Sequence, residues 1–324
     1  MEISVVDQSP IFTNTNADQA IKDSVELAQY SDQIGLKRFW LAEHHGSNSF
    51  AGCSPEILIP RIASSTKNIR VGSGGVMLMH YSPYKVAENF RLLESMFPRR
   101  IDLGLGRAPG SDPFQAGALA YGSKTTGPEF FPTKMNDLRS FLSNQTPETK
   151  SFENVNVTPG LGDVPDTWLL VSSEQGADYA SFFGLPMSLA YFINQDCLHL
   201  AKPYRENFQK SIFGDSPQVS VAVFAICAET NEEANLLASS ASIWRENVSK
   251  GIFGPFPTLE EATKKIKDKD KEEGKSIVGD QKYVEGQLMK ILEETNADEL
   301  KIITICESMS SKKESYRLIK EIFS

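Results

Sequence analysis

Two adjacent histidines offer the clearest chemistry in this sequence. His44 and His45 follow Glu43 at the end of an apolar run that predicts a strand. Because consecutive side chains of a strand point to opposite faces, one histidine of the pair should face the interior of the fold. A histidine there can act as a general acid or base near neutral pH, or it can bind a metal. A packed or capping pair of histidines is the alternative.

A metal site is not predicted from these histidines. His80, at the end of the next predicted strand, is the one other histidine expected in this zone. A zinc site usually has a third ligand and a spacing such as HxH or HExxH, and neither spacing occurs here. Proton transfer is therefore the favoured chemistry for the pair.

A glycine-rich stretch, Gly72-Ser73-Gly74-Gly75, ends the third predicted strand. Because glycine has no side chain, such a stretch can form a turn or bulge, or it can let a flat ligand lie against the peptide plane. The residue types alone leave both interpretations open.

Arg107 lies within a second glycine-rich run at the end of the fourth predicted strand. The run has the spacing GxGxxxG with Pro109 inside it, and no helix is predicted to begin there. It therefore lacks the GxGxxG fingerprint of a dinucleotide-binding fold. A guanidinium among glycines at the end of a strand favours an anion clamp, because its paired donors match a phosphate. An ordinary surface ion pair is the alternative.

Two hydroxyls and a glycine connect the fifth predicted strand to the next helix. Ser172, Ser173 and Gly176 place hydroxyl and N–H donors at a helix N-terminus, where the helix dipole favours an anion. This pattern predicts a phosphate site. The alternative is that one serine simply caps the helix, and the two roles are compatible.

The elements that must position these residues alternate regularly. Eight strands are predicted, at residues 3–6, 39–42, 69–73, 101–105, 167–171, 187–191, 219–227 and 300–305. Helices are predicted at residues 16–34, from 54 onwards, and at 84–96, 134–142, 175–183, 198–212, 232–248, 282–292 and 312–322. Pro60 is expected to kink or shorten the second helix. Eight strands alternating with helices are typical of an α/β (β/α)8 TIM barrel, whose sites lie on the loops after the strands. A doubly wound open sheet is the alternative.

One TIM-barrel domain covering residues 1–324 is predicted, with loop insertions. The longest hydrophilic insertion, residues 254–280, contains a run of mixed charge and is bounded by glycines. It is a candidate mobile lid, because a long insertion on the loop side of a barrel lies where it could cover the site. A solvated helix face is the alternative for the charged run.

Composition narrows the classes of partner. The chain of 324 residues has 33 basic and 42 acidic side chains and a net charge of −9, which argues against nucleic-acid binding. No apolar run approaches the ~20 residues of a membrane span, and the start does not resemble a signal peptide. The 4 cysteines are widely separated, which suits free thiols in a reducing compartment. We therefore expect a cytoplasmic protein with no nucleic-acid or membrane partner.

The motifs, taken in order, resemble a known family over essentially the whole chain. They are Phe39-Trp40-Leu41-Ala42-Glu43-His44-His45, Ile69-Arg70-Val71-Gly72-Ser73-Gly74-Gly75, His80-Tyr81-Ser82-Pro83, Arg100-Ile101-Asp102-Leu103-Gly104-Leu105-Gly106-Arg107 and Gly184-Leu185-Pro186. Their order and spacing resemble the bacterial luciferase-like flavin-dependent monooxygenases. The resemblance implies a TIM barrel that binds reduced flavin mononucleotide (FMN) non-covalently and activates O2 at C4a of the flavin ring.

The resemblance also implies roles for single residues. His44 matches the catalytic base beside the flavin ring, and Gly74-Gly75 matches the segment that lies against this ring, often through a non-proline cis peptide. Tyr191 falls where an aromatic side chain approaches the ring. The cradle for the flavin phosphate is matched by Arg107, Ser172, Ser173 and Gly176. Further candidates for the pocket are Asp7, Glu43 and His80.

The expected reaction is the oxidation of a small apolar carbonyl compound such as an alkanal. Reduced FMN would come from a separate flavin reductase, O2 would be the oxidant, and a homodimer is expected. Gly106 and Ser172 stand where the light-emitting α subunits carry a cysteine and a glutamate, so light emission is not expected. Two alternatives stay open: a deazaflavin-dependent hydride-transfer dehydrogenase on the same barrel, and a non-catalytic flavin-binding protein.

Overall fold

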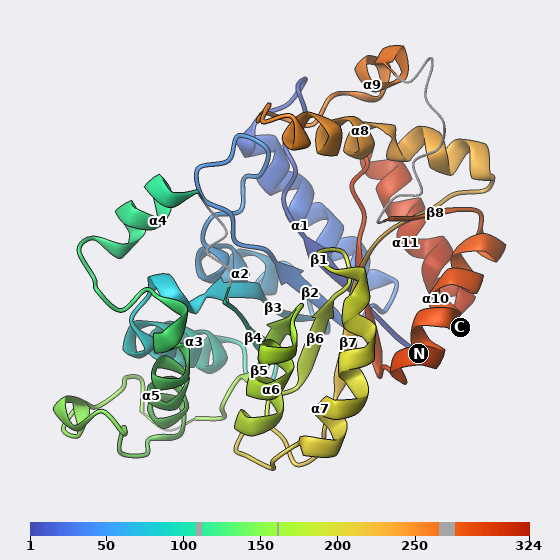
Figure 1. Cartoon of the computed structure of the whole chain (residues 1–324). Coiled ribbons are helices and arrows are strands. Elements are labelled where there is room, and N and C mark those ends of the chain that lie inside the picture. The colour runs from blue at the N-terminus through green and yellow to red at the C-terminus, as the bar shows by residue number, and fades with distance from the viewer. Residues whose placement is uncertain (108–111, 161, 266–275) are drawn as a thin grey trace.

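The structure is a computed structural model that describes residues 1–107, 112–160, 162–265 and 276–324. Figure 1 shows its helices arranged around central strands. The strands are β1 (Glu2–Asp7), β2 (Arg38–Leu41), β3 (Arg70–Met77), β4 (Ile101–Gly106), β5 (Asp166–Val171), β6 (Met187–Ala190), β7 (Val219–Cys227), β8 (Ser276–Gly279) and β9 (Glu299–Ile303). The α-helices are α1 (Ala17–Gln33), α2 (Pro55–Ala63), α3 (Pro83–Met96), α4 (Pro113–Ala120), α5 (Phe131–Ser143), α6 (Glu174–Phe183), α7 (Ala201–Asn207), α8 (Asn231–Ser249), α9 (Leu259–Lys265), α10 (Gln281–Thr295) and α11 (Met309–Ile322).

Parallel strands close into a barrel. Within the described residues, each strand from β1 to β7 pairs with the next, β7 also pairs with β9, and β9 pairs with β1. This closed ring of eight strands confirms the predicted (β/α)8 barrel and excludes the open sheet. The sequence analysis missed β8, which pairs with the last residues of β7, Phe224–Cys227, and lies outside the ring.

Alternation along each strand separates two apolar clusters. Val5 and Phe39 face the surrounding helices and join the large outer cluster. Val6, Trp40 and Trp168 face inward and join a smaller inner cluster. The rings of Trp40 and Trp168 meet edge to face, with centroids 5.7 Å apart. Because the barrel is filled by side chains, a ligand has to bind at the mouth formed by the carboxyl ends of the strands.

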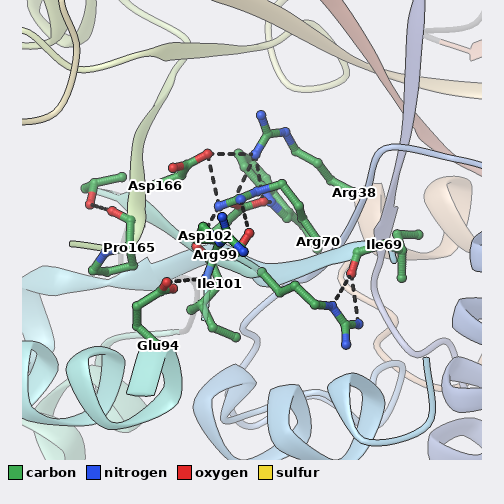
Figure 2. Close-up of polar contacts among 12 residues, drawn as sticks. Arg38, Ile69, Arg70, Glu94, Arg99, Ile101, Asp102, Pro165 and Asp166 are labelled. Atoms are coloured by element: carbon green, nitrogen blue, oxygen red, sulfur yellow. Dashed lines mark hydrogen bonds and ion pairs between the residues drawn. The ribbon is translucent and has the colours of Figure 1, made fainter. Parts of the chain in front are cut away.

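Charged residues close the opposite, amino-terminal end of the barrel (Figure 2). The buried carboxylate of Asp102 accepts hydrogen bonds from Arg38 Nη1 at 2.9 Å and from Arg70 Nε at 2.7 Å. Arg38 Nε also donates to Glu299 at 2.9 Å, and half-exposed Asp166 lies 3.0 Å from Arg70 Nη2. Burial alone would lower the pKa of Arg38, but the carboxylates of Asp102 and Glu299 raise it above its ordinary value. These buried charges are paired and hydrogen-bonded, which offsets much of the cost of removing them from water.

Lys301 adds a fully buried cation above this network. Its Nζ lies 4.1 Å from the ring centroids of both Trp40 and Trp168. It also donates to Ser220 Oγ at 2.5 Å and lies 3.4 Å from Glu299 Oε1. Burial lowers the pKa of Lys301 to about 8, against the opposing effect of Glu299. A cation held between two indole rings therefore forms the floor of the barrel interior.

Two predicted helices differ from the observed ones. The helix α2 continues past Pro60 to Ala63, since the N–H of Ser64 still donates to the carbonyl of Pro60 at 3.0 Å. The helix predicted at 198–212 was too long, because α7 ends at Asn207. The chain then turns back to α6, where Gln209 N donates to Ser181 O at 2.9 Å.

The predicted lid, residues 254–280, is only partly described. Residues 266–275 fall outside the described residues, so the lid as a whole stays a prediction. Its first part includes α9, which packs on α8 (Figure 1), and its last part is β8. The end of the predicted insertion therefore belongs to the sheet.

None of the helices in the described part of the chain combines the length and apolar character that a bilayer span requires.

Candidate active site

His44 lies in the loop after β2, on the inner side of that loop. Its ring stacks on Phe50 with centroids 4.3 Å apart and an angle of 23° between the planes, and Phe50 packs on the inner cluster. Burial, and then the neighbouring charge of His45, lower the pKa of His44 to about 4. In the described part of the chain, its buried Nδ1 has no hydrogen-bond partner. The imidazole is therefore neutral at pH 7 and is able to accept a proton from a bound molecule.

Glu43 and His45 point to the other side of the same loop, toward the helices. The carboxylate of Glu43 accepts from the Tyr81 hydroxyl at 2.5 Å and from Met77 N at 3.1 Å, and it lies 2.7 Å from His45 Nε2. Desolvation and this carboxylate raise the pKa of Tyr81. The ring of His80 meets that of His45 edge to face, with centroids 6.3 Å apart. Glu43 and His80 are thus grouped with His45 and not with His44.

Among the described residues, no three His, Cys, Asp or Glu side chains are placed to hold a metal ion.

The stability of the fold should depend on pH through His44. Its pKa in the folded chain is about 4, whereas a histidine in an unfolded chain has a pKa of about 6.5. As the pH falls below 6.5 the unfolded state takes up the proton first, so stability present above that pH is lost toward pH 4. Between pH 7 and pH 5 we expect wild type to lose about 2 kcal/mol more than His44→Asn in free energy of unfolding. Equal losses in urea titrations of the two proteins would show that His44 titrates normally.

Gly74 and Gly75 lie in the second half of β3 and are joined by a cis peptide bond. A Cβ atom on Gly74 would lie 3.0 Å from Cβ of Trp40, and one on Gly75 would lie 2.6 Å from the carbonyl oxygen of Gly104. The pairing of β3 with β4 shifts register between Gly74 and Val76. Neither glycine leaves room for a side chain, so bare backbone is exposed to whatever binds above Trp40.

Arg107 and Ser173 meet at the N-terminus of α6. Arg107 Nη2 donates to Ser173 Oγ at 3.0 Å, and Nη1 donates to Gln175 Oε1 at 2.6 Å. The guanidinium also lies 5.5 Å from the ring centroid of Tyr179. These contacts hold a cation in front of a helix N-terminus, where an anion is favoured by both the charge and the dipole. The structure thus brings together two residues that are 66 positions apart in the sequence.

Ser172 and Gly176 are the other two predicted site residues at the N-terminus of α6. Ser173 is the N-cap of α6, with its Oγ accepting from Gly176 N at 3.4 Å, so the capping interpretation of this serine is confirmed. A Cβ atom on Gly176 would lie 3.1 Å from Val171 Cγ1, which means that glycine allows α6 to approach β5 closely. Ser172 precedes the cap, and its carbonyl accepts from Asn194 Nδ2 at 2.9 Å. We call Arg107, Ser172, Ser173 and Gly176 the anion cradle.

Two predicted pocket residues lie elsewhere. Tyr191 packs on the outer cluster, and Phe192 instead joins the inner cluster, where its ring lies 5.3 Å from that of Phe224. The resemblance placed Tyr191 beside the flavin ring, whereas the alternation that continues from Met187 and Leu189 puts its side chain on the outer side. Asp7 faces α1, where its carboxylate accepts from Ser24 Oγ at 2.5 Å. Its neighbour Val6 faces inward, so Asp7 is a helix contact and not a pocket residue.

The sequence analysis missed an aromatic cluster at the barrel mouth. Trp244 of α8 stacks on Phe256 with centroids 4.6 Å apart, and Phe50 meets both rings edge to face at 5.5 and 5.6 Å. Phe12 contacts Phe256 at 5.6 Å. These residues come from three distant segments, so no local spacing in the sequence indicates that they meet. The cluster makes this part of the mouth apolar, directly beside His44.

Fold and site together define a class of protein: a (β/α)8 barrel with an arginine at a helix N-terminus and a neutral histidine at its mouth. The family model described as luciferase-like monooxygenase matches residues 1–289. The luciferase-like monooxygenase of Escherichia coli (strain K12) is 33% identical over 307 residues, which cover 92% of this chain and 90% of the relative. The N-acetyl-S-alkylcysteine monooxygenase of Bacillus subtilis (strain 168) is 37% identical over 235 residues, which cover 72% and 70%. The chain belongs to the luciferase-like monooxygenase family, and this confirms the resemblance seen in the sequence.

Solved structures agree with this assignment. The crystal structure of apo-MsnO8 matches with a TM-score of 0.90 and 33% identity, covering 99% of this chain and 98% of that one. An FMN complex of the oxygenating constituent of 3,6-diketocamphane monooxygenase from Pseudomonas putida has a TM-score of 0.73 at 18% identity and covers 98% and 96%. An F420-dependent secondary alcohol dehydrogenase has a TM-score of 0.65 at 12% identity and covers 98% of each chain. The last two show the common fold alone.

Proposed function

We propose that this chain is an FMN-dependent monooxygenase that oxidises small apolar carbonyl compounds with reduced FMN and O2. The observation that carries the proposal is the contact of Arg107 with Ser173 at the N-terminus of α6. This anion cradle follows β4 and β5, His44 follows β2, and Gly74-Gly75 lie in the second half of β3. All of them therefore lie toward the carboxyl ends of neighbouring strands, where a barrel binds its ligands.

The residues present fit FMN. Its phosphate would lie in the anion cradle, where Arg107 supplies paired donors and α6 supplies its N-terminal dipole. Its flat ring would lie against the backbone of Gly74-Gly75, where any Cβ atom would collide with Trp40 or Gly104. The unpartnered Nδ1 of His44 would then face a group that can share a proton with it. When bound in its reduced form, FMN would activate O2 for oxygen transfer.

The chain's own side chains would carry out three tasks. The anion cradle binds the cofactor by its charge, and the glycine backbone orients its ring. His44, neutral at pH 7, accepts a proton from the reacting molecule and returns it later in the cycle. The cluster of Phe50, Trp244 and Phe256 excludes water from the same space, which protects reactive species from hydrolysis.

The proposed substrate class follows from the apolar barrel mouth beside His44, and the proposed reductase partner follows from the sequence around Arg107. An apolar mouth next to a proton acceptor suits a small apolar carbonyl compound better than a charged one. The glycine run at Arg107 has no GxGxxG spacing for a nicotinamide dinucleotide. We therefore propose that a separate flavin reductase supplies the reduced FMN.

Turnover measurements test this function. The purified chain would receive chemically reduced FMN in buffer equilibrated with isotopically labelled O2, together with a panel of alkanals, cyclic ketones and N-acetyl-S-alkylcysteines, and the products would be identified by mass spectrometry. Incorporation of one atom of labelled oxygen into an aldehyde or ketone supports the proposal. Oxygenation of the thioethers alone would keep the monooxygenase chemistry but overturn the proposed substrate class.

Arg107→Ala should weaken FMN binding through the phosphate alone. We expect a loss of about 1.5–3 kcal/mol in binding free energy, the scale for a hydrogen bond to a charged group. Riboflavin has the same ring and no phosphate, so it should bind wild type and Arg107→Ala equally. Titrations followed by flavin fluorescence measure both ligands. An equal loss for FMN and riboflavin would make Arg107 a structural residue.

The alternative cofactor is a deazaflavin such as F420, which also carries a phosphate for the cradle. The F420-dependent secondary alcohol dehydrogenase shares this fold. Such a cofactor would transfer a hydride to or from the substrate, and O2 would not be consumed. Oxygen-electrode measurements with each cofactor separate the two functions, and binding of FMN without turnover of any substrate would favour a non-catalytic flavin-binding protein.

A further inference from the structure

We propose that Trp244 is a positioning residue for His44, acting through the ring of Phe50. The inference rests on the proposed role of His44 as the proton acceptor. Trp244 does not contact His44 in the ring pairs of the described residues; Phe50 lies between them, stacked on His44 at 4.3 Å and edge to face with Trp244 at 5.5 Å. The three rings form a continuous series from α8 to the loop after β2.

His44 lacks the usual means of orientation. In most sites that use a histidine as acid or base, a carboxylate or carbonyl binds one ring nitrogen and fixes the ring. Here the adjacent carboxylate, Glu43, is occupied by His45, Tyr81 and a backbone N–H on the other side of the loop. Nδ1 of His44 has no partner among the described residues. Stacking on Phe50 is therefore the contact that sets the plane of the imidazole.

Phe50 in turn is held in place by Trp244. Trp244 Nε1 donates to Ser49 Oγ at 3.0 Å and to the carbonyl of Gly254 at 3.1 Å, and Ser49 Oγ donates to the same carbonyl at 2.7 Å. The residue before Phe50 is thus tied to α8 and to the segment that follows it. Phe50 also forms a backbone bridge with Pro10. Removing the indole would release the loop that carries the stacking partner of His44.

The same rings cover His44 against water. Desolvation is the main cause of its lowered pKa, and His45 is the titratable neighbour whose charge acts on it. Loosening Phe50 admits water to the imidazole, and its pKa should then rise toward the ordinary value of about 6.5. His45 lies on the other side of the loop and does not contact the aromatic cluster in the described residues. Its charge should therefore stay the same in a Trp244 variant.

The test is an NMR titration of the histidine rings in the full, flavin-free chain, with the signals of His44 assigned from His44→Asn. Trp244→Leu should raise the pKa of His44 by about one unit or more, a tenfold change in proton affinity. Trp244→Phe restores most of the ring contact and should give a smaller rise. Phe12→Leu is the matched control, because Phe12 packs on Phe256 in the same cluster and should leave the titration of His44 unchanged.

The outcomes separate this inference from the proposed function. A titration of His44 that is unchanged in Trp244→Leu and Trp244→Phe overturns the positioning role, and so does an equal shift in Phe12→Leu. If Trp244→Leu does not fold, Trp244→Phe and Phe12→Leu decide the question alone. A raised pKa together with a lower kcat, as a displaced imidazole would give, supports both proposals. A raised pKa with unchanged kcat at every pH keeps the positioning role and overturns the role of His44 as proton acceptor.

Discussion

His44→Ala is expected to retain its fold and its affinity for FMN while its turnover falls by roughly 10²–10⁴, the usual contribution of a positioned acid or base. The variant loses a neutral imidazole, because burial lowers the pKa of His44 to about 4. It loses no hydrogen bond at Nδ1 to the described residues. The cost in stability is therefore that of one ring contact with Phe50, roughly 1 kcal/mol. Steady-state turnover and urea unfolding measure the two effects separately.

His45→Ala is the matched control for this experiment. Its Nε2 lies 2.7 Å from a carboxylate oxygen of Glu43, and Glu43 is 2% exposed. Truncation leaves a buried carboxylate with one partner fewer, which should cost about 1–3 kcal/mol of stability. Turnover per folded molecule should change little. Wild-type turnover by His44→Ala with every accepted substrate would contradict the role assigned to this histidine.

Asp102→Ala should be the most destabilising single change at the amino-terminal end of the barrel. The carboxylate of Asp102 is fully buried and accepts hydrogen bonds from Arg38, Arg70 and the indole of Trp40, the last at 2.8 Å. Its removal leaves buried cations short of a counter-charge, which costs about 3–5 kcal/mol. Denaturant titration would show this as a lower midpoint with an unchanged slope.

Asp166→Ala is the control for Asp102→Ala. Asp166 faces the same two arginines, at 3.5 Å from Arg38 and 3.0 Å from Arg70, but its side chain is 51% exposed. An exposed ion pair contributes about 0–1 kcal/mol, so this variant should unfold nearly like wild type. Equal losses for the two variants would mean that burial does not distinguish the two carboxylates.

Much of the fold was predictable because its signals are local. Each barrel strand is a short apolar run next to a helix with its own period, and alternation predicted that one histidine of the pair faces inward, which in the structure is His44. The proximity of Arg107 and Ser173 was also predictable, since each follows a strand end and such ends gather on one face of a barrel. Family membership confirmed the class of enzyme. The roles of His44 and of the cradle stay proposals.

The errors have identifiable physical causes. Tyr191 was placed beside the flavin ring by the resemblance, whereas the alternation that continues from Met187 and Leu189 puts Tyr191 outward and Phe192 inward. The strand β8 was missed because it has 4 residues and lies inside a hydrophilic insertion. The aromatic cluster depends on contacts between segments about 200 residues apart, such as Ser49 and Trp244, which no local pattern encodes.

The buried charges at the amino-terminal end of the barrel have a consequence for the order of events in a catalytic cycle. Asp102 and Lys301 are fully buried, and Trp40 and Trp168 fill the space above them. The barrel is therefore closed at that end, and in the proposed function the cofactor, substrate and product would share the opening at the other end. Whichever molecule binds deeper has to arrive first and depart last. In the proposed function, a sequential order of addition and release would thus follow from the closed end of the barrel and not from the groups that take part in the reaction.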